Sequence, residues 1–187
     1  MWYTLRMKFK IIKDKNPIMR KKSLPVEMPL SKEDKDTLDE MLNYLKLSQD
    51  EEYLKNHNIR SGIGMAAIQI GILKRMFVVY YPISETEFVE YELVNPKIIE
   101  TSIRKCALAN GEGCLSVDAD HKGLSHRYYK IKMQAYDALT DQEIIITARG
   151  YDAIVLQHEY DHLDGIFFYD RIDPKKPDVQ LMNEELI

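Results

Sequence analysis

Apolar residues recur at helical spacing in a segment near the start of the chain. Four of them fall on one face of a helix: Leu38, Met41, Leu42 and Leu45. Ser31 stands where an N-cap is expected, and Asp34 follows in the first turn, where a carboxylate favours the helix dipole. The pattern predicts an amphipathic surface helix from Lys32 to about Leu47.

A second helical pattern lies in the last quarter of the chain. Five residues share one stripe: Tyr151, Ile154, Val155, His158 and His162. Asp152 belongs to its first turn, and Gly165 follows as a C-terminal stop. Ile154 and Val155 are expected to be core residues, and we hypothesise that the apolar part of the stripe also forms one wall of a pocket.

Between the two helices, short β-branched and aromatic runs predict strands. The expected strands cover residues 77–81, 88–93 and 97–99, with a break at Asn95-Pro96. Alternation over residues 129–136, a turn at Thr140-Asp141 and a second run at 143–148 predict a hairpin. A last short strand is expected at 166–169.

These elements predict an α+β fold in one domain over residues 1–187, with small mixed or antiparallel strands around the second helix and an N-terminal helix before them. Residues 1–29 lack periodicity and predict an irregular arm. The proline- and charge-rich tail after Asp173 is predicted to be peripheral.

Composition narrows the classes of function. The 187 residues carry a net charge of −4, which does not favour a nucleic-acid surface. No apolar run reaches the length of a membrane span, and the first residues lack the apolar core of a signal peptide. Two cysteines, Cys106 and Cys114, do not suggest a disulfide framework. We therefore expect a cytoplasmic protein with reduced thiols.

The second helix carries the strongest chemical signal, the sequence H-E-x-x-H. His158 and His162 are four residues apart, so both imidazoles reach one metal ion from the same helical face. Glu159 stands beside the first histidine and is suited to take a proton from water at the metal. Two surface histidines or a structural metal site are the alternatives that this pentapeptide leaves open.

A catalytic metal needs a third protein ligand. Phe168 occupies the position where one known extension of the motif has another histidine, so the ligand must come from elsewhere. The downstream carboxylates of Asp170, Asp173 and Glu184 stand in no clear helical context. Cys114 is the strongest candidate, because a thiolate binds Zn²⁺ or Fe²⁺ well and its segment is able to run as an extended strand edge. The alternative for Cys114 is a buried inert thiol. Cys106 is expected to be an apolar filler.

Three segments together resemble the motifs of peptide deformylases. Residues 62–69 match G-x-G-x-A-A-x-Q, residues 112–116 match E-G-C-L-S, and residues 157–162 match Q-H-E-x-D-H. The resemblance implies that Cys114, His158 and His162 bind one divalent ion. It implies Fe²⁺ natively, with Zn²⁺, Ni²⁺ or Co²⁺ as substitutes. The implied reaction removes the formyl group from the N-terminal formylmethionine of nascent polypeptides and releases formate.

The resemblance also implies roles for other residues. Glu159 would move the proton, while the Gln69 amide and the Leu115 N–H would meet the oxyanion. The methionine pocket would be lined by Tyr151, Ile154 and Val155, with Ile63 and Gly64 nearby. Backbone near Gly64, Gly113 and Leu115 would pair with the substrate as an added strand.

Glu112 beside this site would pair with Arg127, as in the family; two unrelated surface charges are the alternative. Formylmethionyl nascent peptides are the expected partners, with transient ribosome association. We expect a monomer with neither a nucleic-acid site nor a membrane contact. The rival functions are a metalloprotease that cuts internal peptide bonds and a metal-stabilised binding module without activity.

Overall fold

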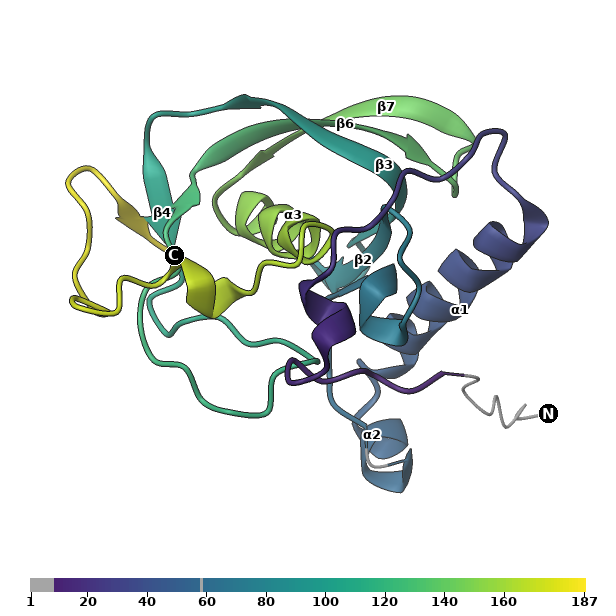
Figure 1. Ribbon diagram of the computed structural model, residues 1–187, viewed down its shortest axis with the longest axis horizontal. Helices are drawn as coiled ribbons and strands as arrows, with labels where there is room; N and C mark the ends of the chain where they lie inside the picture. The colour runs from purple at the N-terminus through teal and green to yellow at the C-terminus, as the bar shows by residue number, and fades with distance from the viewer. Residues whose placement is uncertain (1–8, 58) are drawn as a thin grey trace.

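The computed structural model describes residues 9–57 and 59–187 (Figure 1). The first eight residues of the predicted N-terminal arm therefore lie outside the described residues. The rest of the arm is irregular apart from one turn of 3-10 helix, η1 (Pro17–Arg20). Three α-helices follow within the described residues: α1 (Lys32–Leu47), α2 (Glu51–His57) and α3 (Gly150–His162).

The main sheet has five antiparallel strands in the order β1-β2-β3-β6-β7. Its strands are β1 (Gly64–Ala66), β2 (Met76–Pro82), β3 (Phe88–Thr101), β6 (Lys130–Asp137) and β7 (Gln142–Arg149). A smaller sheet in the order β5-β4-β8 consists of β4 (Lys105–Ala107), β5 (Arg127–Tyr128) and β8 (Glu185–Leu186). Figure 1 shows the main sheet arching over α3. The prediction of an α+β fold, with strands around the helix that carries His158 and His162, is confirmed, and this helix is α3.

The two faces of the main sheet bury different helices. Phe77 and Val79 of β2 pack in one apolar cluster with Ala153, Val155 and Leu156 of α3. Met76 and Val78 of the same strand pack in another cluster with the four apolar residues of the α1 stripe. A strand covered on both sides has a continuous apolar run, which is why β2 begins Met-Phe-Val-Val rather than alternating.

Helix α1 agrees with the sequence prediction at both ends. Ser31 is the N-cap, and its Oγ accepts a hydrogen bond of 3.1 Å from the backbone N–H of Asp34. Such a cap satisfies one of the N–H groups that a helix leaves unpaired and typically contributes about 1 kcal/mol. The hairpin of β6 and β7 is also confirmed, with Asp141 in the left-handed region at φ 56°.

Three local predictions were wrong. Asn95-Pro96 does not end a strand: β3 continues through a register shift there, with Asn95 at φ 50° and its side chain bound to the backbone of Val26. Residues 166–169 form no strand, since the 3-10 helix η3 (Phe168–Arg171) occupies their end. The tail is exposed over most of residues 174–183, as predicted, but its end is not peripheral, because β8 pairs with β4 and Glu184 is buried against His126.

Glu92 of β3 is an acid in the core between the main sheet and α1. It is 0% exposed, and neither carboxyl oxygen accepts a hydrogen bond from a described residue. Burial raises its pKa to about 8, helped by the neighbouring carboxylates of Asp39 and Asp137 and opposed by Lys35. The folded protein therefore holds a proton on Glu92 at neutral pH, whereas the unfolded chain does not.

We predict that Glu92→Gln stabilises the protein selectively at alkaline pH. From about pH 4.5 to pH 8 the unfolded chain loses the Glu92 proton first, so the parent loses stability as pH rises, and Gln removes this loss. The melting temperatures of parent and variant should diverge between pH 5 and pH 9. The gap should grow by at least ~2–4 °C, the shift for about 1 kcal/mol in a domain of this size. Parallel melting curves across this pH range would contradict the prediction.

Candidate active site

Helix α3 presents two imidazoles to the interior one turn apart. The rings of His158 and His162 lie 4.9 Å apart between centroids, and their residues are 9% and 1% exposed. The short 3-10 helix η3 and the residue before it cover them, since Phe168 stacks on His158 and Phe167 packs edge-to-face with His162. The spacing that the sequence predicted therefore places both rings on the buried face of the helix, which rules out two surface histidines.

The thiol of Cys114 meets these rings from a different part of the chain. Its Sγ is 3.3 Å from Nε2 of His162, and the ligand atoms of Cys114, His158 and His162 all lie within 4.8 Å of one another. Metal–sulfur bonds of about 2.3 Å and metal–nitrogen bonds of about 2.1 Å place donor atoms roughly this close around one ion. One sulfur and two nitrogens form a donor set that suits Zn²⁺ or Fe²⁺ rather than a hard cation.

The protonation of the site fits a metal. Burial lowers the pKa of His162 well below its usual value, so this imidazole is neutral, as a ligand must be. Burial opposes a charge on His158 as well, but hydrogen bonds to Cys114 and Glu112 outweigh it and raise that pKa. The raised pKa favours a proton on His158 in the metal-free protein, and a bound cation would displace that proton.

Cys114 does not stand on a strand edge, contrary to the prediction. Residues 111–114 have no regular structure, and Leu115 and Ser116 form a turn. The turn folds back on the sulfur, which accepts a hydrogen bond from the Ser116 N–H at 3.4 Å. Gln69 contacts the same two residues, since its Nε2 lies 3.7 Å from Cys114 Sγ and 3.0 Å from Ser116 Oγ.

Glu159 lines the same cavity as Cys114. Its side chain is buried, and Oε2 has no hydrogen-bond partner among the described residues. Burial raises the pKa of Glu159 to about 7, with Glu112 adding to the rise and His158 and Arg127 opposing it. An acid with such a pKa is able to take up and release a proton near neutral pH.

The site opens into a cavity of about 270 Å³, close to the lower end of ligand-pocket sizes. The six residues predicted to bind substrate all line it: Ile63, Gly64, Gly113, Tyr151, Ile154 and Val155. Gln69, Leu115 and Glu159 line it too, beside Cys114 and His158. The structure thus brings the predicted residues together, and their individual roles stay predictions.

Comparison with known proteins identifies this arrangement. Residues 8–178 match the family model described as polypeptide deformylase. The chain is 45% identical to the peptide deformylase of Macrococcus caseolyticus, over 89% of this chain and 91% of that protein. It is 46% identical to peptide deformylase 2 of Geobacillus stearothermophilus, over 89% and 90%.

Solved structures agree. The fold matches a probable peptide deformylase from a Synechococcus phage with a TM-score of 0.72 at 34% identity, over 88% of this chain and 99% of that chain. It matches the peptide deformylase of Thermus thermophilus with a TM-score of 0.72 at 28% identity, over 90% and 88%.

The chain belongs to the peptide deformylase family. Its activity is the metal-dependent removal of the formyl group from nascent polypeptides, as the motifs predicted. This membership excludes the rival functions of an internal-bond protease and of a binding module without activity. No helix in the described part of the chain combines the length and apolar character that a bilayer crossing requires.

Peptide deformylase motif residues that had no predicted role turn out to connect elements. Gln157 holds α3 to β5, because its Oε1 accepts from the Tyr128 N–H at 2.9 Å and its Nε2 donates to the Tyr128 carbonyl at 2.8 Å. Asp161 binds Arg127 and Arg171. The motif pattern singled out both residues, but only the structure supplies their partners.

The predicted pair of Glu112 and Arg127 is present and buried. Arg127 donates two hydrogen bonds to Glu112, at 2.5 and 2.9 Å, and their side chains are 0% and 3% exposed. Glu112 Oε2 also lies 2.7 Å from Nδ1 of His158, which leaves the other ring nitrogen for a metal. Although burial opposes ionisation, Arg127 and His158 hold the pKa of Glu112 at about 2.

Gly64 of β1 is required by the close approach of Glu159. A Cβ on Gly64 would come within 2.7 Å of the Glu159 Cδ and would overlap its Oε1. At Gly113, which lines the same cavity, a Cβ would meet nothing within 4 Å. The two glycines therefore form a matched pair for testing the position of the carboxylate.

We predict that Gly64→Ala lowers kcat for a formyl-Met peptide by about tenfold or more while the metal content is kept, because the methyl group displaces the Glu159 carboxylate. Gly113→Ala adds the same methyl group without a clash with Glu159, so its kcat should stay within about threefold of the parent, while its place in the substrate-binding wall allows KM to rise. Steady-state kinetics and metal analysis on both variants provide the test. Equal kcat in the two variants would show that Gly64 does not position Glu159.

Proposed function

We propose that this chain hydrolyses N-formylmethionyl peptides at one divalent ion held by Cys114, His158 and His162, with Glu159 as the group that moves the proton. The observation that carries the proposal is the cluster of the Cys114 sulfur and two imidazoles beside one small cavity, which Cys114, His158 and Glu159 line together. When bound, the ion acts as a Lewis acid and lowers the pKa of water at the site.

Glu159 supplies general acid–base chemistry. Its carboxylate takes a proton from the attacking water and later delivers it to the departing amine nitrogen. The pKa of about 7 that burial produces suits both halves of this task. Its buried Oε2, without a partner among the described residues, is the oxygen free to do so.

Gln69 and Leu115 are proposed to meet the negative charge that develops on the formyl oxygen. The Gln69 amide is held by its own Oε1, which accepts from the Ala66 N–H at 2.8 Å, so Nε2 points at the sulfur side of the site. The Leu115 N–H has no acceptor among the described residues, and Leu115 lines the cavity. One such donor typically contributes about 3 kcal/mol to the transition state.

The same cavity accounts for a methionine side chain. Ile63, Ile154, Val155 and Tyr151 provide apolar walls, and the volume of about 270 Å³ suits one side chain. Among the described residues β1 is an edge strand that pairs with β2 alone, so its other edge at Gly64 is available to a substrate strand, with Gly113 and Leu115 lining the same cavity.

The donor set also supports a choice of metal. A thiolate with two imidazoles favours Fe²⁺ or Zn²⁺ over hard cations, and we propose Fe²⁺ as the native ion, with Zn²⁺, Ni²⁺ or Co²⁺ as substitutes. We further propose a monomeric, cytoplasmic enzyme of one catalytic domain over residues 1–187, in transient contact with the ribosomes that produce its substrate. The main sheet contributes residues to both apolar clusters, which supports one domain.

Formate release from a formyl-Met tripeptide, with metal analysis on the same sample, tests the central proposal. A peptide with an acetyl in place of the formyl group is the matched control. We expect formate and a free amino terminus from the first peptide, an uncleaved acetyl group on the second, and about one metal per chain. Metal without formate release would contradict the assignment of substrate.

Replacing the proton carrier should separate metal binding from catalysis. Glu159→Gln keeps the shape of the side chain but removes its basicity, so we expect about a hundredfold loss of kcat or more with the metal retained. Kinetics and metal content of the purified variant provide the measurement. Turnover at the parent rate would remove Glu159 from the mechanism.

The iron form should be sensitive to oxygen at the sulfur ligand. In air, we expect the Fe²⁺ form to lose activity within hours as iron and the Cys114 thiolate are oxidised, while the Ni²⁺ form persists. Mass spectrometry should find added oxygen at Cys114 but not at Cys106, because burial raises the pKa of Cys106 to about 11 and keeps it a thiol. An aerobic iron form that stays fully active for days would contradict this.

A further inference from the structure

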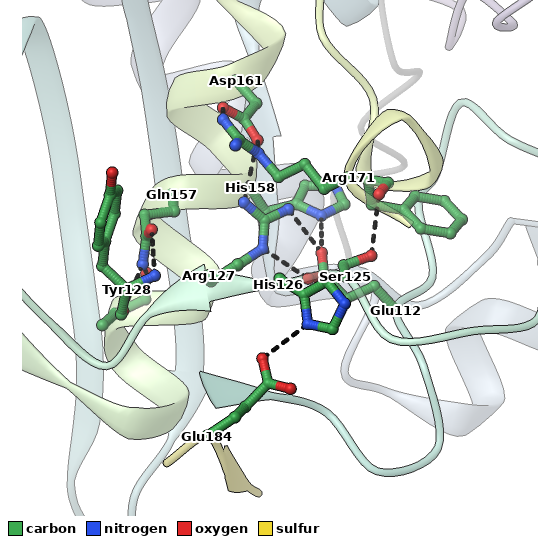
Figure 2. Close-up of polar contacts among 12 residues, drawn as sticks. Glu112, Ser125, His126, Arg127, Tyr128, Gln157, His158, Asp161, Arg171 and Glu184 are labelled. Carbon is green, nitrogen blue, oxygen red and sulfur yellow. Dashed lines mark hydrogen bonds and ion pairs between the residues drawn. The ribbon is translucent and has the colours of Figure 1, made fainter. Parts of the chain in front are cut away.

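A continuous row of charged side chains leads from the metal ligand His158 to the surface (Figure 2). Glu112 binds Nδ1 of His158, and Arg127 binds Glu112. Arg127 also donates through Nη1 to Asp161 Oδ2 at 2.9 Å. Arg171 closes the row by donating through Nε and Nη2 to both oxygens of Asp161.

The row is buried at its inner end and reaches solvent only at Arg171. The side chains of Glu112, Arg127 and Asp161 are 3%, 0% and 5% exposed, whereas that of Arg171 is 37% exposed. Two carboxylates face two guanidinium groups, so the four charges balance. Removing Arg171 would leave one negative charge in excess beside a buried ion pair, a costly arrangement in a dry interior.

Arg171 is also tied to the rings of the metal ligands through its own backbone. It is the last residue of η3, whose Phe168 stacks on His158. Ser125 Oγ donates to the Phe168 carbonyl at 2.9 Å, so η3 is held from the β5 side as well. The guanidinium group of Arg171 therefore links η3, which packs over His158, to Asp161 of α3, the helix that carries both histidines.

We propose that Arg171 is a positioning residue for His158, acting through Asp161, Arg127 and Glu112. This inference rests on the proposed metal site. Arg171 donates hydrogen bonds to both oxygens of Asp161 and so fixes the orientation of this carboxylate, which accepts a hydrogen bond from Arg127. Arg127 in turn holds Glu112 at Nδ1 of His158, so the ring keeps the tautomer and orientation that leave its other nitrogen for the ion.

Co²⁺ binding by the whole protein tests the proposal, because its affinity and visible spectrum report on the ligands independently of turnover. Arg171→Met keeps the length of the side chain and removes the fork. We expect about tenfold weaker Co²⁺ binding in chelator competition, together with a changed absorption spectrum. Lys132→Met is the matched control: it removes one positive charge from a salt bridge with Glu100 at a side chain 38% exposed, and it should bind Co²⁺ like the parent.

Arg171→Lys separates the fork from the charge. Lysine keeps the charge but does not grip both oxygens of Asp161, so we expect a loss of about threefold to tenfold, between the parent and Arg171→Met. The melting temperature of each metal-free variant shows whether it is folded. If Arg171→Met does not fold, Arg171→Lys alone decides. The proposal would be overturned if Arg171→Lys bound Co²⁺ with the same affinity and absorption spectrum as the parent.

A purely structural role has its own signature. Arg171→Met would then lower the melting temperature of the metal-free protein and leave the Co²⁺ affinity and spectrum within about twofold of the parent, and this result would overturn the proposal. Failure of the proposed metal site is distinguishable, because the parent protein itself would then bind no Co²⁺ with the absorption of a thiolate ligand.

Discussion

A thiol and two imidazoles held within 4.8 Å of one another in a buried site are the constraint around which this structure is arranged. Polar groups buried so closely are costly unless each finds a partner or an ion. Two segments far apart in the chain must meet for the contact to exist, because Cys114 and His162 are 48 residues apart. The arching sheet and the packing of α3 beneath it hold these segments together (Figure 1).

The charges around the metal ligands follow from the same constraint. A ligand imidazole needs a partner for its second nitrogen, and Glu112 supplies it at His158. Glu112 is itself buried, so it requires Arg127, and Arg127 is shared with Asp161. Each buried charge thus needs a partner of opposite charge, and the series ends at Arg171, whose side chain is partly exposed to water. These ion pairs hold the His158 ring in place more rigidly than metal coordination alone would hold it.

Chemistry and recognition share one wall of the cavity. α3 contributes the apolar side chains of Ile154 and Val155 one turn before His158 and Glu159, so a side chain bound in the pocket lies beside the reacting groups. The carboxylate of Glu159 is packed against the bare backbone of Gly64 on the edge strand β1. A substrate that pairs with this edge would therefore arrive with its terminal amide near the proton carrier.

The sequence by itself determined the periodic elements and the site chemistry. The apolar stripe and Ser31 cap of α1, the alternation of β6, and the four-residue spacing of His158 and His162 are local patterns, and local geometry decides which face such residues occupy. Only the tertiary structure decided that Cys114 lies in an irregular segment just before a turn rather than on a strand, that residues 168–171 form a 3-10 helix, and that β8 pairs with β4. It also decided that Arg171 meets Asp161. These outcomes depend on packing and charge partners distant in sequence, which no local periodicity encodes.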